Sequence, residues 1–166
     1  MIFVTVGTHE QQFNRLVKGM DELILDNVIM EKVFIQKGYS NYDPEFCESK
    51  GLMDYDEMIN KTKEASIVIT HGGPGSIMLA LSMGKIPIVF PRNPEYEEHV
   101  DNHQILFTKR LEEEKKIIAV YKKEDLKEVI LNYAAKVKEL KQFTTNNNKE
   151  KFVEKLEDIV GQLINK

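Results

Sequence analysis

Features that mark several protein classes are scarce in this 166-residue sequence. Cysteine occurs once, as Cys47, which excludes an internal disulfide and a cysteine-based metal site and favours the cytosol. The longest apolar runs are only a few residues, too short to span a bilayer as a helix. The first residues lack the basic region that opens a signal peptide. Acidic residues outnumber basic ones, 27 against 23, which disfavours nucleic acid as a partner.

The remaining composition is that of one globular domain, because 42% of the residues are hydrophobic and 30% are charged. Short apolar runs typical of buried strands alternate with stripes typical of amphipathic helices. We expect strands within residues 2–6, 32–37, 46–49, 66–70, 86–90 and 116–121. We expect helices at residues 13–24, from Asp54 with a capping box to Glu57, at 77–83, and from the end of loop 93–98 to about 114. This order predicts a single Rossmann-like α/β domain, residues 1–166, with a doubly wound parallel sheet.

Residues 124–166 are expected to form C-terminal helices. One apolar stripe runs from Leu126 to Leu140 and a second from Phe152 to Ile164, with a polar turn or hinge at Thr144–Asn148 between them. We expect the first helix to pack on its own domain. The second either packs there too or presents its apolar stripe to a partner.

The turn after the fourth expected strand is rich in glycine: it reads His71-Gly72-Gly73-Pro74-Gly75-Ser76. Glycines let the backbone approach a ligand closely, and the following helix offers free N–H groups, so a phosphate or diphosphate is the natural ligand. Ser76 can cap this helix and donate to a phosphate oxygen. The alternative is a tight turn without a ligand. The spacing matches neither a Walker A loop nor G-x-G-x-x-G.

Two more strand ends carry polar side chains. Gly7, Thr8 and His9 follow the first strand and are expected at the same sheet edge, although Thr8 could simply be an N-cap. The run from Glu95 to Gln104 is dense in hydrogen-bonding groups, which suits a sugar. Its alternative is a solvated helix start. His99 and His103, spaced i and i+4, could share a helix face and bind a metal, but no third ligand is evident.

Three motifs together resemble a known family. They are MIFVTVGTHEQQFNRL (residues 1–16), HGGPGSIMLALSMGKIP (71–87) and PRNPEYEEHVDNHQ (91–104). Over residues 1–115 the chain resembles the glycosyltransferases of family 28 C-terminal-domain type, which share the C-terminal half of the lipid II-forming N-acetylglucosaminyltransferase. Within that group it is most similar to the small catalytic subunits of two-component capsular and exopolysaccharide glycosyltransferases. The resemblance implies one half of a GT-B fold that binds the UDP-sugar donor.

The resemblance also implies roles for the motif residues. Gly7 and Thr8 would lie near the diphosphate, which the turn after the fourth strand would cradle. Sugar hydroxyls would be contacted by the pair Glu98 and His99 and by the run Asn102-His103-Gln104. The diphosphate set is therefore Gly7, Thr8, His71, Gly72, Gly73, Gly75 and Ser76, and the sugar set is Glu98, His99, Asn102, His103 and Gln104.

The implied activity is that of an inverting hexosyltransferase, similar to a β-1,4-galactosyltransferase. Its substrate would be a UDP-sugar, with UDP-galactose favoured, and it would need no cofactor and no metal ion. The acceptor would be a lipid-linked saccharide. A membrane-anchored partner subunit would hold the acceptor and supply the general base, with His9 as the fallback candidate. The chain would then lie in the cytoplasm, peripheral to the inner face of the plasma membrane.

One departure from the family pattern is Leu79, which stands where many relatives carry a glutamate that holds the ribose hydroxyls. Leucine cannot accept those hydrogen bonds, which favours an alternative: a non-catalytic nucleotide-binding module with a regulatory or structural role. A flavodoxin-like or receiver domain is disfavoured, because Gly7, Thr8 and His9 follow the first strand in place of an acidic pair.

Overall fold

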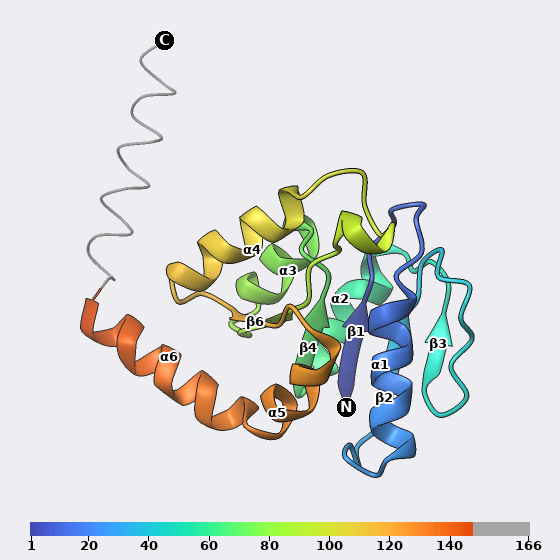
Figure 1. Cartoon of the computed structure of the whole chain (residues 1–166). Coiled ribbons are helices and arrows are strands. Elements are labelled where there is room, and N and C mark those ends of the chain that lie inside the picture. The colour runs from blue at the N-terminus through green and yellow to red at the C-terminus, as the bar shows by residue number, and fades with distance from the viewer. Residues whose placement is uncertain (148–166) are drawn as a thin grey trace. The chain divides into compact units, whose positions relative to one another are not determined.

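The computed structural model describes residues 1–147 (Figure 1), and the chain divides into two units after Tyr133. The first unit, residues 1–133, contains a six-stranded sheet and the helices that cover it. The described part of the second unit is most of helix α6, Tyr133–Asn147. No helix within residues 1–147 is both long and apolar enough to cross a membrane.

All six strands of the sheet are parallel, in the order β3-β2-β1-β4-β5-β6. This order confirms the predicted doubly wound, Rossmann-like fold. Every residue of β1 and β4 is buried, as expected for central strands covered on both faces. The strands are β1 Ile2–Thr5, β2 Val33–Gln36, β3 Glu48–Lys50, β4 Ile67–Thr70, β5 Ile88–Val89 and β6 Ile118–Ala119.

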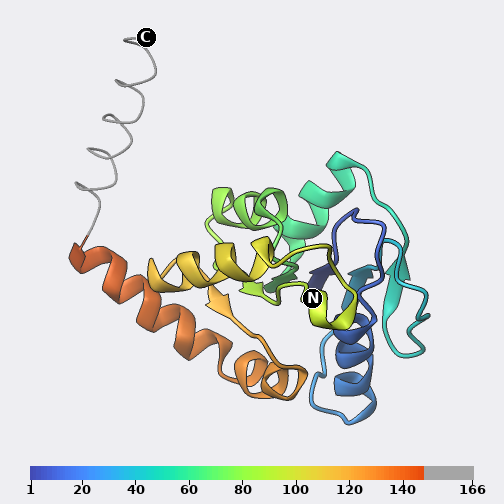
Figure 2. The ribbon, with the colours of Figure 1, turned by 45° about the horizontal axis from the view of Figure 1, so that its top comes forward.

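Helices cover both faces of the sheet, with α2 and α3 on one side and α1 and α5 on the other (Figure 2). On the first side Phe3 and Val68 pack with Ala80 of α3, and Leu111 of α4 packs with Ile77. The helices are α1 Asn14–Leu25, α2 Tyr55–Glu64, α3 Pro74–Ser82, α4 His103–Glu113 and α5 Leu126–Leu131, with short 3-10 helices η1 Pro94–Tyr96 and η2 Lys123–Asp125.

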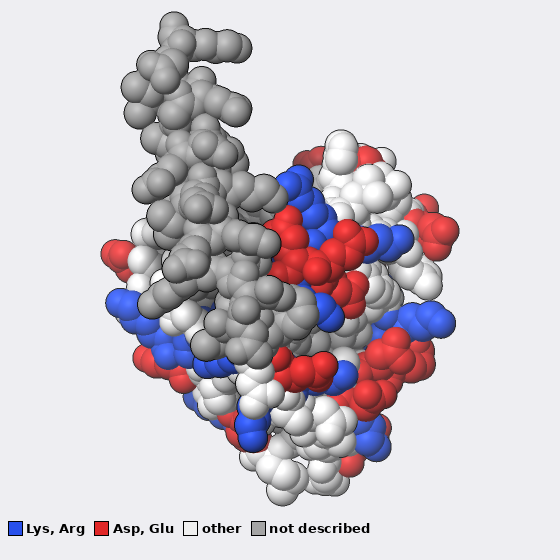
Figure 3. Space-filling view, turned by 90° about the vertical axis from the view of Figure 1, so that its left-hand side faces the viewer, with Lys and Arg blue, Asp and Glu red and all other residues white. Residues whose placement is uncertain are grey.

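Helix α1 buries the predicted apolar stripe through Phe13, Leu16, Val17 and Met20. A Cβ on Gly19 would lie 3.0 Å from Lys123 Cγ, so α1 packs closely on η2. Figure 3 shows a different face, the left-hand side of Figure 1, on which acidic and basic side chains are interspersed among the described residues.

A buried carboxylate joins α1 to the segment before β3. Asp21 is 1% exposed and accepts four hydrogen bonds: 2.8 Å from Tyr42 Oη, and 2.9, 2.7 and 3.0 Å from the backbone N–H groups of Glu45, Phe46 and Cys47. Burial by itself raises the pKa of Asp21, but these donors outweigh it, so the pKa lies below its usual value. The charged carboxylate therefore stabilises the folded state.

The predicted start of α2 is confirmed, whereas that of α3 is corrected. Asp54 and Glu57 form the expected reciprocal capping box, with bonds of 2.8 and 3.0 Å. Ser76 does not cap α3, because the helix begins two residues earlier at Pro74, with Gly73 as N-cap. Proline suits that first position, since its fixed φ is helical and no N–H is lost.

The C-terminal prediction needs two corrections. The single helix expected over residues 126–140 is divided at Asn132, whose backbone and side-chain amides both donate to Glu128 O and so end α5. The polar turn expected at residues 144–148 is helical as far as Asn147, because no glycine or proline interrupts the run. The stripe expected at residues 152–164 lies outside the described residues.

Candidate active site

The carboxyl ends of β1 and β4 lie side by side, and the chain leaves them toward opposite edges of the sheet. Such a switch point opens a crevice between the two following turns and is where doubly wound sheets bind ligands. Here the two turns are those at Gly7 and His71, both predicted from the sequence. Their detailed geometry decides what the crevice can hold.

The turn after β1 is fixed by a buried glutamine. Gln36, 2% exposed, accepts from Gly7 N at 3.2 Å through Oε1 and donates to Gly7 O at 3.0 Å through Nε2. Gly7 has a φ of +77°, a conformation that glycine adopts without strain. Both peptide groups of Gly7 are therefore used inside the protein. Thr8, which is exposed, is the first residue of this turn able to meet a ligand, and it is not an N-cap, because α1 begins at Asn14.

The His71 ring occupies the floor of the crevice. A Cβ on Gly7 would lie 2.5 Å from its Nε2, and one on Gly73 only 2.1 Å away, so the two glycines enclose the imidazole. Burial, followed by the positive charge of Arg92, lowers the pKa of His71 to about 4. The ring is neutral at pH 7 and can therefore act as a hydrogen-bonding group without a charge.

The N-terminus of α3 faces the same crevice with unused donors. None of the described residues accepts a hydrogen bond from the backbone N–H groups of Gly72, Gly73, Gly75 or Ser76. A Cβ on Gly75 would have no atom within 4 Å. Free N–H groups, the positive end of a helix dipole and open space together suit an anionic group.

Two residues of the predicted sugar set face inward. Glu98 is 1% exposed, and its carboxylate accepts from Arg15 Nε and Nη2 at 2.9 and 2.8 Å and from Asn93 N at 2.9 Å. Gln104 accepts from the backbone N–H of Arg92 at 3.2 Å. Both side chains hold the loop after β5 in place.

Three histidines and an aspartate line up beside this loop. The rings of His9 and His99 stack with centroids 4.5 Å apart. Asp101 lies 3.1 Å from Nδ1 of His99 and 2.9 Å from Nδ1 of His103. The backbone N–H of His103, foremost among several contributions, lowers the pKa of Asp101. The structure thus brings the polar ends of β1 and β5 together.

The predicted shared helix face of His99 and His103 is wrong, because α4 begins only at His103 and follows Asn102 as its N-cap. His103 is 82% exposed in its side chain, and Asn102 is also exposed. Within residues 1–147, no group of three or more histidine, cysteine, aspartate or glutamate side chains is placed to hold a metal ion.

A cavity of about 520 Å³ lies between the loops that follow β1 and β5. It is lined by Gln11, Gln12, Pro94, Glu97, His99 and Val100. Only His99 belongs to the predicted sugar set. The two glutamines were missed, although a polar pair two residues beyond His9, in the loop after the first strand, could have indicated them.

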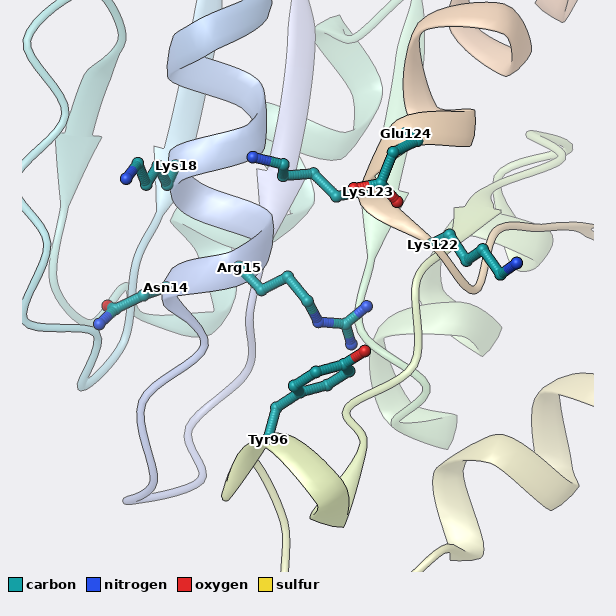
Figure 4. Close-up of a pocket in the computed structure, with 7 residues that line it drawn as sticks. All are labelled: Asn14, Arg15, Lys18, Tyr96, Lys122, Lys123 and Glu124. Carbon is teal, nitrogen blue, oxygen red and sulfur yellow. The ribbon is translucent and has the colours of Figure 1, made fainter.

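A second hollow, of about 400 Å³, lies between α1 and η2 (Figure 4). Four of its lining residues are cationic, but Arg15 is paired with Glu98, and Lys123 is paired with Glu22 at 2.8 Å. Its charge is therefore largely compensated. It is lined by Asn14, Arg15, Lys18, Tyr96, Lys122, Lys123 and Glu124.

Comparison with known proteins places this geometry in a family. No curated protein matches the chain. Among solved structures, it is similar to the glycotransferase of kitacinnamycin (TM-score 0.59, 14% identity, 85% of this chain and 38% of that one). It is also similar to the spinosyn forosaminyltransferase SpnP (TM-score 0.57, 13% identity, 96% of this chain and 43% of that one). The chain thus spans less than half the length of either enzyme. The family model of the glycosyltransferase family 28 C-terminal domain matches residues 1–160, and the chain belongs to that family.

Proposed function

We propose that this chain binds the UDP-sugar donor of a glycosyltransferase, with UDP-galactose favoured, at the carboxyl edge of its sheet. The observation that carries the proposal is the set of free N–H groups at the start of α3, which border the crevice at the switch point. Family membership supports a nucleotide-sugar ligand. Transfer would be to a lipid-linked saccharide, in capsular or exopolysaccharide synthesis.

The diphosphate would lie on the N-terminus of α3. Gly75 and Ser76 supply N–H donors at the open side, and Thr8 supplies a hydroxyl from the facing turn. The neutral His71 ring, on the floor of the crevice, would make one hydrogen bond to the diphosphate. Gly7 supports the site through its φ and its closeness to that ring, without offering a donor.

The sugar would extend into the cavity between the loops after β1 and β5. Gln11, Gln12 and His99 can meet its hydroxyls there, since they line the cavity. Glu98 and Gln104 would act indirectly, by fixing the loop that carries His99. A sugar needs several directional donors and acceptors, and amide and imidazole groups supply both.

The reaction would be an inverting displacement. The acceptor oxygen forms a bond to the anomeric carbon as the bond from that carbon to the diphosphate oxygen breaks, and the hydroxyl proton passes to a base. The helix N–H groups would stabilise the charge that develops on the diphosphate, so we propose that no metal ion is required. His9 is the candidate base within this chain, since its ring stacks on that of His99.

A second protein would complete the enzyme. Large side chains are exposed on the loops at the carboxyl edge, among them Tyr39 (54%), Tyr96 (54%) and Val100 (76%). A membrane-anchored partner that covers the sheet edge and carries the acceptor fits these surfaces, and it would place the chain at the inner face of the membrane.

The alternative, a non-catalytic nucleotide-binding module, is favoured by one observation. Leu79 is half-buried on α3, where the family resemblance expects a carboxylate for the ribose. Both functions predict nucleotide binding and differ only in transfer. Co-expression with candidate membrane subunits, followed by an assay of sugar transfer to a lipid-linked monosaccharide, separates them.

Calorimetric titration with UDP, UDP-galactose, UDP-N-acetylglucosamine and ADP tests the binding site. We expect uridine nucleotides to bind and His71→Ala to weaken UDP about tenfold, the effect of one lost hydrogen bond to a charged ligand. Lys63→Ala, on the exposed surface of α2, is the control and should bind as the wild type does. If no uridine nucleotide binds, the proposed function is wrong.

A further inference from the structure

Arg92, in the loop after β5, is unusual because its side chain is fully buried at 0% exposed. Arginine is almost never buried without a paired carboxylate. None of the ion pairs within residues 1–147 involves Arg92, and its Nε has no hydrogen-bond partner there. A side chain of this kind requires an explanation beyond packing.

Its remaining donors join the two loops that form the walls of the 520 Å³ cavity. Nη1 donates to the carbonyl oxygens of Gln11 at 2.8 Å, Gln12 at 3.1 Å and Glu98 at 2.9 Å. Nη2 donates to Val6 O at 2.9 Å. One guanidinium thus fixes the chain on both sides of the cavity, and only its planar fork can reach four carbonyls at once.

Arg92 also contributes charge. Glu98 is the nearest compensating group, but both its carboxylate oxygens are bound by Arg15, whose guanidinium lies over the Tyr96 ring (Figure 4). The Glu98 carboxylate is therefore bound by Arg15, and among residues 1–147 no ion pair compensates the positive charge of Arg92 behind the crevice. Burial lowers the pKa of Arg92 to about 10, so the side chain remains charged at pH 7.

We propose that Arg92 is a positioning residue of the donor site, which sets the separation of the two cavity walls and supplies an internal positive charge that favours the diphosphate. The proposal rests on the proposed function for its ligand. It extends that function, because Arg92 has no exposed surface and acts on a nucleotide that it does not touch. Substitution separates the two roles, because lysine keeps the positive charge but cannot reproduce the planar fork that holds the two loops.

The test compares Arg92→Met, Arg92→Lys and the surface control Arg110→Met, whose side chain is 77% exposed. Calorimetry gives affinities for UDP and for uridine, which lacks the phosphates. We expect Arg92→Met to weaken UDP at least about tenfold more than uridine, because a charge in a poorly screened interior acts over several ångströms. Arg92→Lys should weaken both ligands while it keeps their ratio within about threefold, and Arg110→Met should change neither.

The His71 imidazole offers a readout that needs no ligand, in which the difference between the methionine and lysine variants separates lost charge from lost packing. Arg92→Met should raise the pKa of His71 in an NMR titration, since the charge of Arg92 is among the causes of its low value. Arg92→Lys should raise it less. If Arg92→Met does not fold, Arg92→Lys provides the test. Weaker binding of both UDP and uridine, with the ratio of their affinities within about threefold of the wild type, is the expected result, and a larger change in that ratio contradicts the proposal.

An equal loss of UDP and uridine affinity in Arg92→Met would overturn the electrostatic role. Wild-type affinities in Arg92→Lys would overturn the positioning role. Failure of the wild type to bind UDP would instead overturn the proposed function and, with it, the ligand part of this inference. An unchanged His71 titration in Arg92→Met would then refute the internal charge as well.

Discussion

Alanine at Gly75 should stabilise the protein and yet weaken nucleotide binding. Gly75 is the second residue of α3, and a Cβ there would meet no atom within 4 Å. Alanine restricts the unfolded chain more than glycine does, so the free energy of unfolding should rise by about 0.4–1 kcal/mol. The methyl group would, however, occupy the open space beside the free N–H groups, where we place the diphosphate. We expect UDP affinity to fall at least about tenfold.

Gly73→Ala is the matched variant two residues earlier, with the opposite effect on stability. Its Cβ would lie 2.1 Å from His71 Nε2 and 2.8 Å from Cδ2, well inside ordinary contact. The ring cannot yield easily, because Gly7 encloses it on the other side. Forcing a buried ring to move costs about 1–3 kcal/mol of stability. UDP affinity should fall as well, because His71 leaves its place.

Urea unfolding and calorimetric titration with UDP distinguish these outcomes. A stabilised Gly75→Ala protein that binds UDP as tightly as the wild type would refute the placement of the diphosphate on α3. A Gly73→Ala protein as stable as the wild type would show that the ring is not enclosed as described. Because the two variants differ in stability with opposite sign, general damage to the fold cannot explain a loss of binding in both.

Three further substitutions test the supports of the site and the fold. Asp21→Asn should lower the free energy of unfolding by about 1.5–3 kcal/mol at pH 7, measured by urea unfolding. Because folding lowers the pKa of Asp21, the extra stability of the wild type should be complete above the unfolded-state pKa near 3.9 and should be lost as the pH falls through the folded-state pKa. Gln36→Leu should cost about 1–3 kcal/mol, since Gly7 O loses its donor and Gly7 N keeps only its 3.3 Å bond to Thr5 Oγ1, and it should weaken UDP binding measured by calorimetry. Tyr133→Phe removes the 2.8 Å bond to Ile86 O and should lower the free energy of unfolding by about 1 kcal/mol.

The sheet could be predicted from the sequence because its central strands are continuous apolar runs bounded by glycine or charge. The runs beginning at Ile2 and Ile67 became β1 and β4 within a residue of expectation. The 3-10 helix at Pro94–Tyr96 and the break at Asn132 were not predicted. Both depend on local hydrogen bonds that no hydrophobic period encodes: Glu95 N donates to Asn93 Oδ1, and Asn132 Nδ2 donates to Glu128 O.

The candidate site was predictable in location but not in the direction of its side chains. Sequence reasoning placed Gly7, His71 and the loop after β5 at one edge, and the structure does the same. It did not show that Glu98 turns inward to Arg15, because that pair is 83 residues apart in the chain. Gln36 carried a usable signal: a polar residue that closes an apolar strand needs a buried partner.

The position of His71 decides how deeply a ligand can enter. A switch point normally leaves its crevice open between the first turns on either side. In this protein the imidazole fills that space between Gly7 and Gly73, and the backbone N–H of His71 donates to Thr5 O at 3.1 Å. On the proposed function, a diphosphate would lie above the ring, at the level of Gly75, and not between the strands. Gly7 and Gly73 are required to accommodate the histidine ring, which leaves Gly75, together with Thr8 and Ser76, for the proposed ligand.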